Sequence, residues 1–295
     1  MSTNIHAEQK PLIYLIGKHV KLVDDATFCK SIIADGKELI TGNERGELVV
    51  PELNDEKVYI TFKEDLTSLA NAFSGCSALK SIPENLFANC PKATDFSFTF
   101  FGCKALTAIP EGLFANNPKV TIFQGTFSYC SALKSLPANL FANNRKVNSF
   151  RLTFSGCSAL KSIPEKLFAN CPKVNTFFQT FALCKSLKSI PTGLFAHNPE
   201  VTDFSGTFSG CSALESIPKN LFANNRKVTD FSYTFTGCYA LTGESPYTMI
   251  GDKKVHLYER ADYPEHFTAP TVFLDCFKNC TGLTDYAQIP TNWKE

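Results

Sequence analysis

This 295-residue chain has twelve cysteines and five histidines, the residue types most able to bind a metal or to act as nucleophiles and bases. The cysteines form no C-x-x-C pair, and none lies at zinc-ligand spacing from a histidine. No spacing predicts a Ser–His–Asp or Cys–His arrangement, and there is no phosphate-binding glycine loop. We therefore expect no enzyme, no catalytic residue, no metal site and no cofactor.

Most of the cysteines instead recur at a fixed position, three residues after a phenylalanine. These are Cys76, Cys103, Cys130, Cys157, Cys184, Cys211, Cys238 and Cys280. Cys90 and Cys171 lie in a second column that otherwise holds asparagine. Neighbours in a column would lie about 5 Å apart, within disulfide reach but with parallel side chains. We expect buried free thiols that pack as small apolar groups. Disulfides between coils, or between Cys276 and Cys280, are the alternative.

The cysteines belong to a 27-residue phrase, seen at 154–180 as FSGCSALKSIPEKLFANCPKVNTFFQT. A fixed period of this length is the signature of a repeat solenoid, in which each coil buries its apolar face against its neighbours. Each coil has two similar halves, and a proline that lacks an N–H ends the first half in six coils. We expect about eight coils, each with two short strands that pair in parallel and two helical or 3-10 turns.

Three segments follow from this rhythm. Residues 1–63 are rich in strand-like runs and predict a β-rich N-terminal cap, or else a small independent domain. Residues 64–243 form the regular solenoid. Residues 244–295 hold an insertion of 15 residues with a predicted hairpin at 247–259, a last degenerate repeat and a C-terminal cap. The alternative for the insertion is a protruding recognition loop.

The phrase F-x-G-C-x-x-L-x-x-I-P, with a later L-F, resembles the BspA-like, Treponema-type leucine-rich repeats of bacterial surface proteins over roughly residues 66–290. The ending GLTDYAQIPTNWK at 282–294 is similar to endings of such proteins from gut bacteria. The resemblance implies a leucine-rich-repeat-like solenoid and adhesion or ligand binding at a cell surface. Repeats of this kind also occur on phage-encoded proteins.

Charge and hydropathy limit the partners and the location. A net charge of +1 gives no strong attraction to nucleic acid or to an acidic membrane. No apolar run approaches the roughly 18 residues that a membrane span needs. Residues 1–10 are polar, so we expect no signal peptide. The resemblance implies a surface or secreted protein, whereas this polar start favours a virion or the cytoplasm. The sequence predicts no oligomeric state.

Lysine recurs in two columns of the repeat. One is Lys92, Lys119, Lys146, Lys173 and Lys227, with Glu200 as the exception, and the other is Lys80, Lys134, Lys161 and Lys188, with Glu215 as the exception. We expect solvated edges that prevent strand pairing. The alternative is a basic stripe for anionic glycans or phosphate polymers, which the interleaved Glu84, Glu111 and Glu165 would weaken.

Other columns mix glycine with large side chains, which a core column does not do. Their large members are Phe98, Phe101, Tyr129, Arg151, Leu152, Phe178, Gln179, Leu183 and Tyr233. If they are exposed, they form an aromatic and apolar patch of the kind that marks a partner site. The alternative is that they fold inward and fill the space beside the glycines. We predict a non-enzymatic recognition or adhesion module for a protein or glycan. A phage structural or receptor-binding component and an intracellular scaffold are the alternatives.

Overall fold

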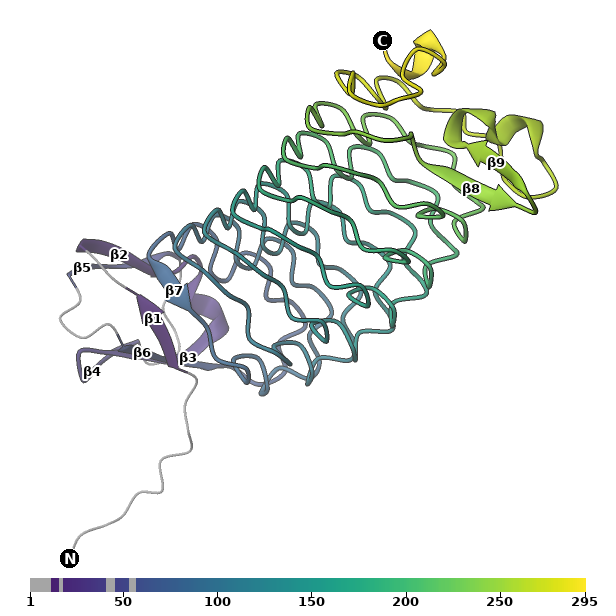
Figure 1. Ribbon diagram of the computed structural model, residues 1–295. Helices are drawn as coiled ribbons and strands as arrows, with labels where there is room; N and C mark the ends of the chain where they lie inside the picture. The colour runs from purple at the N-terminus through teal and green to yellow at the C-terminus, as the bar shows by residue number, and fades with distance from the viewer. Residues whose placement is uncertain (1–11, 16–17, 41–45, 53–56) are drawn as a thin grey trace, which may run out of the picture.

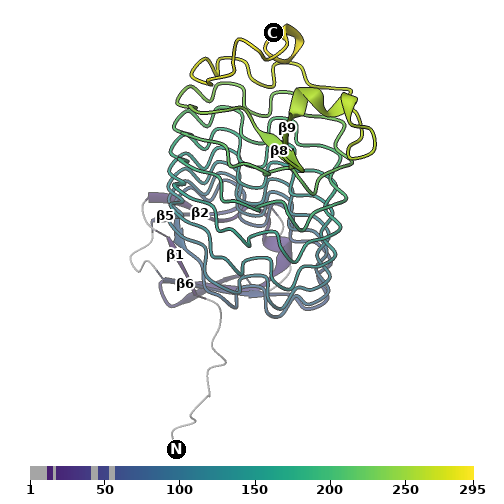
Figure 2. The ribbon, with the colours of Figure 1, turned by 45° about the vertical axis from the view of Figure 1, so that its right-hand side comes forward.

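The computed structural model describes residues 12–15, 18–40, 46–52 and 57–295, so the polar start at 1–10 lies outside the described residues. The coils stack along one axis, with a sheet at the N-terminal end and the yellow C-terminal segment at the other (Figure 1). Turning the molecule by 45° shows the same stack as a regular series of closed loops (Figure 2). No helix in the described part of the chain is long and apolar enough to cross a membrane.

Phenylalanine columns fill the inside of the coils. Phe127 and Phe154 of consecutive coils stack with ring centroids 5.8 Å apart, and Phe150 and Phe177 stack at 5.9 Å. All four are fully buried. Burying one such ring contributes about 1.5–3 kcal/mol. Because every coil presents the same rings, each coil provides the template for its neighbour, and the 27-residue period sets the whole body.

The backbone ladder between coils is thinner than we predicted. One of the two short strands expected in each coil would cover residues 159–163 in the phrase at 154–180, and it is not formed. Neighbouring coils are joined by single parallel bridges such as Ser149 with Thr176, and by backbone hydrogen bonds such as that from the Phe154 N–H to the Thr180 carbonyl at 2.9 Å. The N–H of Leu160 donates to the Cys157 carbonyl at 3.0 Å inside the turn, which removes it from the ladder. Pro164 has no N–H to donate. These two losses leave too few donors for a regular strand.

The turn between each phenylalanine and cysteine closes as its spacing predicts. The Cys130 N–H donates to the Phe127 carbonyl at 3.2 Å, and the Cys157 N–H donates to the Phe154 carbonyl at 3.2 Å. This i to i+3 bond is that of a 3-10 turn. The turn is not continued into a helix in the coils, because the next N–H group turns back on the left-handed residue before the cysteine, as the Ser158 N–H does to the Gly156 carbonyl at 2.8 Å.

The N-terminal segment is a small antiparallel arrangement of strands. The elements are β1 Leu12–Leu15, β2 Lys18–Val23, η1 Ala26–Phe28, β3 Cys29–Ala34, β4 Lys37–Ile40, β5 Leu48–Glu52 and β6 Lys57–Phe62. β7 Leu79–Ser81, in the first coil, joins them as the edge of a sheet with order β4-β3-β6-β1-β7. β2 pairs with β5. Phe62 contacts Phe73 and Phe87 of the first coil at 6.0 and 5.6 Å, so the sheet shares the solenoid core.

The insertion contains the predicted hairpin. β8 Tyr247–Ile250 pairs antiparallel with β9 Lys253–His256, and η2 Leu257–Asp262 follows directly. The hairpin lies along the side of the last coils in both views (Figures 1 and 2). The repeat then resumes, and η3 Thr291–Trp293 brings Trp293 onto Phe273 and Phe277 at the end of the stack.

Candidate functional site

Two columns of the solenoid have a left-handed backbone in every coil, and we call them together the left-handed strip. The first is Asn71, Phe98, Gly125, Leu152, Gln179, Gly206, Tyr233 and Asp275; the second is Gly75, Gly102, Tyr129, Gly156, Leu183, Gly210, Gly237 and Asn279. Glycine, asparagine and aspartate adopt this conformation readily, whereas other residues rarely do. Six positions nevertheless carry phenylalanine, tyrosine, leucine or glutamine, with φ between 49° and 60°.

The bonds between coils impose this backbone whatever the side chain. The Tyr129 N–H donates to the Ser155 carbonyl at 2.7 Å, and the Leu183 N–H donates to the Ser209 carbonyl at 2.7 Å. Bulky residues in the left-handed region cost roughly 1–2 kcal/mol each, and such residues cluster at functional sites. The sequence therefore keeps large side chains at positions where glycine would carry no backbone strain.

Four of the six large side chains, those of Phe98, Tyr129, Gln179 and Leu183, lie over a glycine of the next coil. A Cβ on Gly125 would stand 2.4 Å from the Phe98 ring, and one on Gly210 would stand 2.8 Å from Leu183. The side chains therefore spread along the surface, towards the C-terminal neighbour, instead of entering the core. Tyr129, Leu183 and Tyr233 are 46%, 39% and 42% exposed. The inward-folding alternative is wrong for these three.

The structure brings most of the nine predicted site residues into contact in two groups. Phe101 stands edge-on to both Phe98 and Tyr129, at 6.0 and 5.6 Å. The Arg151 guanidinium stacks over the Phe178 ring at 3.7 Å. Both groups are flanked by half-buried Leu152 and Gln179. Tyr233 lies apart from them, two coils beyond Gln179.

Three exposed residues near the C-terminal end of the strip escaped the sequence analysis. Tyr239 is 66% exposed and lies beside Gly237, and Leu274 and Val272 are 48% and 46% exposed. Tyr239 occupies a column that otherwise holds mostly serine and lysine, and this single aromatic exception could have identified it in the sequence. Leu274 and Val272 lie beyond the insertion, where the period no longer marks their column.

The cysteine columns are hydrogen-bond ladders, not only apolar filling. All twelve cysteines are free and buried. The Cys157 thiol donates to the Phe127 carbonyl of the preceding coil at 3.2 Å, and Cys184 repeats this bond with Phe154 at 3.3 Å. Burial raises the pKa of Cys157 to about 12. The thiols are thus protonated, unreactive donors, and the expectation of free thiols is confirmed.

The mixed cysteine and asparagine column makes the same kind of ladder. The Asn144 side-chain amide donates to the Asn117 carbonyl at 2.9 Å and to the Phe114 carbonyl at 3.4 Å. Cys171 in the next coil points at the equivalent carbonyls from 3.6 and 3.9 Å. The two residue types interchange because each can donate inward at this position. In the residues that the structure describes, the amide oxygen of Asn144 is left without a hydrogen-bond partner.

Arg260 of η2 ends this ladder. Its guanidinium donates to the Phe222 and Asn225 carbonyls at 2.8 and 3.1 Å, where a further coil would place an asparagine. Arg260 is fully buried, with Phe267 under the guanidinium at 4.3 Å. Burial lowers the pKa of Arg260 to about 9, so it is still protonated at neutral pH. The insertion therefore closes one half of the last coil.

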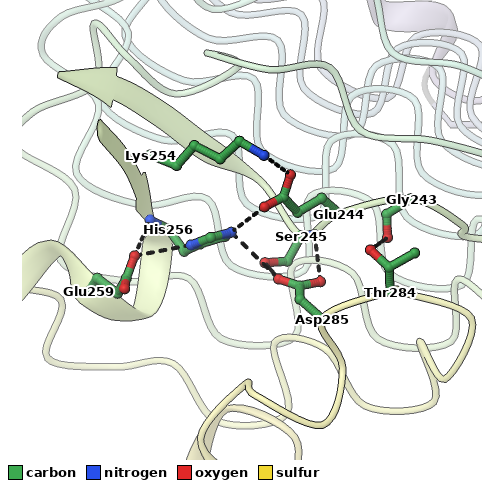
Figure 3. A network of polar contacts seen from close by, with 8 residues as sticks. All are labelled: Gly243, Glu244, Ser245, Lys254, His256, Glu259, Thr284 and Asp285. Carbon is green, nitrogen blue, oxygen red and sulfur yellow. Dashed lines mark hydrogen bonds and ion pairs between the residues drawn. The ribbon is translucent and has the colours of Figure 1, made fainter. Parts of the chain in front are cut away.

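A second polar cluster joins the insertion to the last repeat (Figure 3). His256 lies between Glu259, at 3.0 Å from Nδ1, and Glu244 and Asp285, at 3.3 and 3.6 Å from Nε2. The Ser245 hydroxyl donates to Asp285 and not to His256, so no nucleophile is paired with a base. Among the described residues no group of ligands suits a metal ion. We interpret the cluster as a structural contact that holds the insertion against the last repeat.

Residues 58–242 match the family described as "BspA type Leucine rich repeat region", in 6 copies. The chain belongs to the BspA-type leucine-rich repeat family. Leucine-rich repeat domains generally mediate protein interaction or adhesion, and the family is typically non-enzymatic. A comparison of this BspA-type chain with curated proteins finds no match.

Solved structures that are similar to the BspA-type chain share few of its residues. The Toll–Spätzle complex of Drosophila matches at 17% identity over 58% of this chain and 26% of that chain, with a TM-score of 0.33. A leucine-rich repeat protein from Bacteroides ovatus matches at 22% identity over 66% and 72% of the two chains, with a TM-score of 0.18. The fold assignment therefore rests on the family match and on the coils themselves.

Proposed function

We propose that this chain is a recognition module that binds a protein or glycan through the left-handed strip and its neighbours Phe101, Arg151 and Phe178. The single observation behind this is the presence of bulky side chains at left-handed positions where the same columns elsewhere hold glycine. Strain of this kind persists where it serves a function. Exposed aromatic and arginine side chains are also the commonest anchors of binding surfaces.

The location of this binding is part of the proposal. BspA-type repeats resemble those of bacterial surface proteins, so we place the module at a bacterial surface, with adhesion as its role. The repeating body suits this role because its rows of side chains form an extended surface.

The proposal is tested by screening glycan and host-protein arrays with the native chain and with a Phe98→Ala/Arg151→Ala/Phe178→Ala variant. We expect native binding to be lost in a variant that keeps its circular dichroism spectrum. A matched control is Lys134→Ala/Lys161→Ala/Lys188→Ala, whose lysines lie on the other half of the coil. Retention of every array hit by the strip variant would overturn the assignment of this surface.

A further inference from the structure

Positive charge is concentrated in the middle coils, although the whole chain carries only +1. Residues 112–199 hold ten lysines and arginines but a single acid, Glu165. The remainder of the chain holds the other 19 lysines and arginines against 27 acids. The balanced total therefore hides a strongly basic centre between acidic ends. A field of one sign on an extended surface attracts ligands of the opposite sign.

On the half-coil that leads into the left-handed strip, these cations stand in a row. Lys119, Lys146 and Lys173 are exposed and occupy equivalent positions in three consecutive coils, with Arg145 beside them. Within the part of the chain that the structure describes, none of these four side chains has an acidic partner. The same half-coils contain the buried rings of Phe123, Phe150 and Phe177, whose centroids are 6.0 and 5.9 Å apart in successive coils. The lysines therefore follow one another along the solenoid at about that interval.

The flanking coils show that this column can be neutralised. Lys92 pairs with Asp65 one coil earlier, and Lys227 pairs with Glu200 at 2.7 Å. In this column Lys119, Lys146 and Lys173 follow Lys92 in consecutive coils, and none of these three has an acidic partner in the described part of the chain. Like charges at this spacing repel one another, which opposes folding unless an anion is bound.

A second column changes in the same three coils. At the bridge position the flanking coils carry Asp95, Asp203 and Asp230, whereas the middle coils carry Ile122, Ser149 and Thr176. Each of these aspartates accepts a backbone N–H two residues on, as Asp203 does from Ser205 at 2.8 Å. The acid is thus structurally acceptable but absent where the lysines stack. Two independent columns have lost negative charge on the same surface.

Neutral donors fill the space between the lysine row and the strip. Thr121, Asn148 and Asn175 form the next row, and their backbones are joined by N–H to carbonyl bonds of 3.0 and 2.9 Å. Beyond them lie Gln124, Arg151 and Phe178, and then the large residues of the strip. Each middle coil therefore offers a cation and then a hydroxyl or amide, and the second and third middle coils add the apolar Leu152 and the aromatic Phe178.

We infer that the middle coils bind an acidic polysaccharide, with one carboxylate-bearing sugar for each coil and its chain parallel to the solenoid axis. This inference rests on the proposed function and names its ligand class. Lysines would meet the carboxylates, the amides would meet sugar hydroxyls, and the aromatic rings would pack on the apolar faces of the sugars. A repeating ligand suits a surface whose rows repeat, whereas a folded protein seldom presents one charge at a constant interval.

The test is binding of the native chain to immobilised polygalacturonate and alginate, in which every sugar carries a carboxylate, with dextran, poly-glutamate, polyphosphate and oligothymidylate as comparison polymers. We expect binding to at least one uronate polymer that weakens as salt screens the charges. Lys119→Gln/Lys146→Gln/Lys173→Gln should weaken it about tenfold or more, because charge pairs across an interface add to the binding free energy. The control Lys134→Gln/Lys161→Gln/Lys188→Gln should change it less than about twofold, since it alters the same charge on the other half-coil.

A second variant keeps the fold close to native. The Ile122→Asp/Ser149→Asp variant gives two middle coils the aspartate that the flanking coils already have in this column, as Asp95 and Asp203. We expect this variant to abolish uronate binding. No binding to any uronate polymer, equal loss in both lysine variants, or equal binding to poly-glutamate, polyphosphate or oligothymidylate would overturn the inference. If an array ligand is lost in the strip variant but unaffected by both lysine variants, the proposed function stands and only the acidic ligand is wrong.

Discussion

The ring of Tyr129 lies against the α-carbon of Gly156, one coil further along, where a Cβ would stand 2.7 Å from Tyr129 Cδ1. The same relationship joins Gln179 to Gly206, where a Cβ would stand 2.8 Å from Gln179 Cγ. Four of the six large residues in the left-handed strip, Phe98, Tyr129, Gln179 and Leu183, are followed by a glycine at the same position of the next coil. At these four positions the glycine makes room for the side chain of the preceding coil, whereas Leu152 and Tyr233 are followed by Gln179 and Asp275.

Gly156→Ala should move the Tyr129 ring and destabilise the fold by about 1–3 kcal/mol, from the left-handed backbone and the clash together. Gly102→Ala is the matched control. Its φ of +68° is similar to the +75° of Gly156, but its Cβ would meet nothing closer than 3.9 Å. Urea unfolding of both variants separates the two contributions, and equal losses would show that the ring yields without cost.

Cys171→Asn should leave the free energy of unfolding unchanged or raise it by up to about 1 kcal/mol, because the amide donates more strongly than the thiol. The neighbouring Asn144 and Asn198 show that the site accepts the amide, with bonds of 2.9 Å to the preceding coil. Cys171→Ala should instead lower it by about 1–2 kcal/mol, since it removes the thiol donor to the Phe141 and Asn144 carbonyls, which keep only their backbone donors, and leaves a small cavity. Urea unfolding decides, and a loss in Cys171→Asn as large as in Cys171→Ala would refute the shared donor role.

Much of the architecture could be predicted from the sequence because the same 27-residue pattern of apolar and turn residues recurs in coil after coil. The 27-residue spacing, the buried phenylalanines and the presence of a hairpin in the insertion needed only periodicity and turn chemistry. The hairpin predicted over 247–259 ends earlier than expected, because β9 stops at His256 and η2 begins at Leu257. The extent of the strands could not be predicted, because it depends on which N–H groups the turns consume, as at Leu160.

The sequence also indicated the large residues of the candidate site, since they break columns of glycine. It could not show that Phe98 and Tyr129 have positive φ, because phenylalanine and tyrosine normally adopt negative φ. Arg260 was missed for another reason. It lies in the insertion, 35 residues from Asn225, where no period links it to the ladder that it ends.

Arg260→Met should destabilise the C-terminal coils by about 1–3 kcal/mol, because the buried Asn225 carbonyl loses its side-chain donor and the Phe222 carbonyl keeps only the Asn225 N–H. The exposed Arg226→Met is the control and should change the free energy of unfolding by less than about 0.5 kcal/mol. Hydrogen exchange of the amides near Asn225 gives the local effect. Unchanged exchange in Arg260→Met would mean that the guanidinium is not the terminator of the ladder.

Stability should fall steeply in alkaline solution. Burial raises the pKa of Cys157, Cys171 and Cys211 to about 12, whereas an unfolded thiol titrates near 8.5. Because the folded pKa is raised, the stabilisation is complete below pH ~8.5 and is lost as pH rises towards 12, by up to about 1.4 kcal/mol per pH unit for each thiol.

Urea unfolding at pH 7, 8.5 and 9.5 measures this loss. A Cys90→Asn/Cys171→Asn variant removes two titrating thiols and should make the decline above pH 8.5 shallower by about 3 kcal/mol per pH unit. Native unfolding free energies that stay level from pH 8 to 9.5 would contradict the buried, protonated state of the columns.

The most direct measurement of the central claim compares binding and stability in Phe98→Gly/Tyr129→Gly/Leu183→Gly. Glycine is the residue that these columns hold in other coils, so relief of backbone strain offsets the lost surface packing. We predict that array binding disappears while the free energy of unfolding stays within about 1 kcal/mol of the native value. A variant that binds every native ligand with undiminished affinity would contradict the role of the left-handed strip.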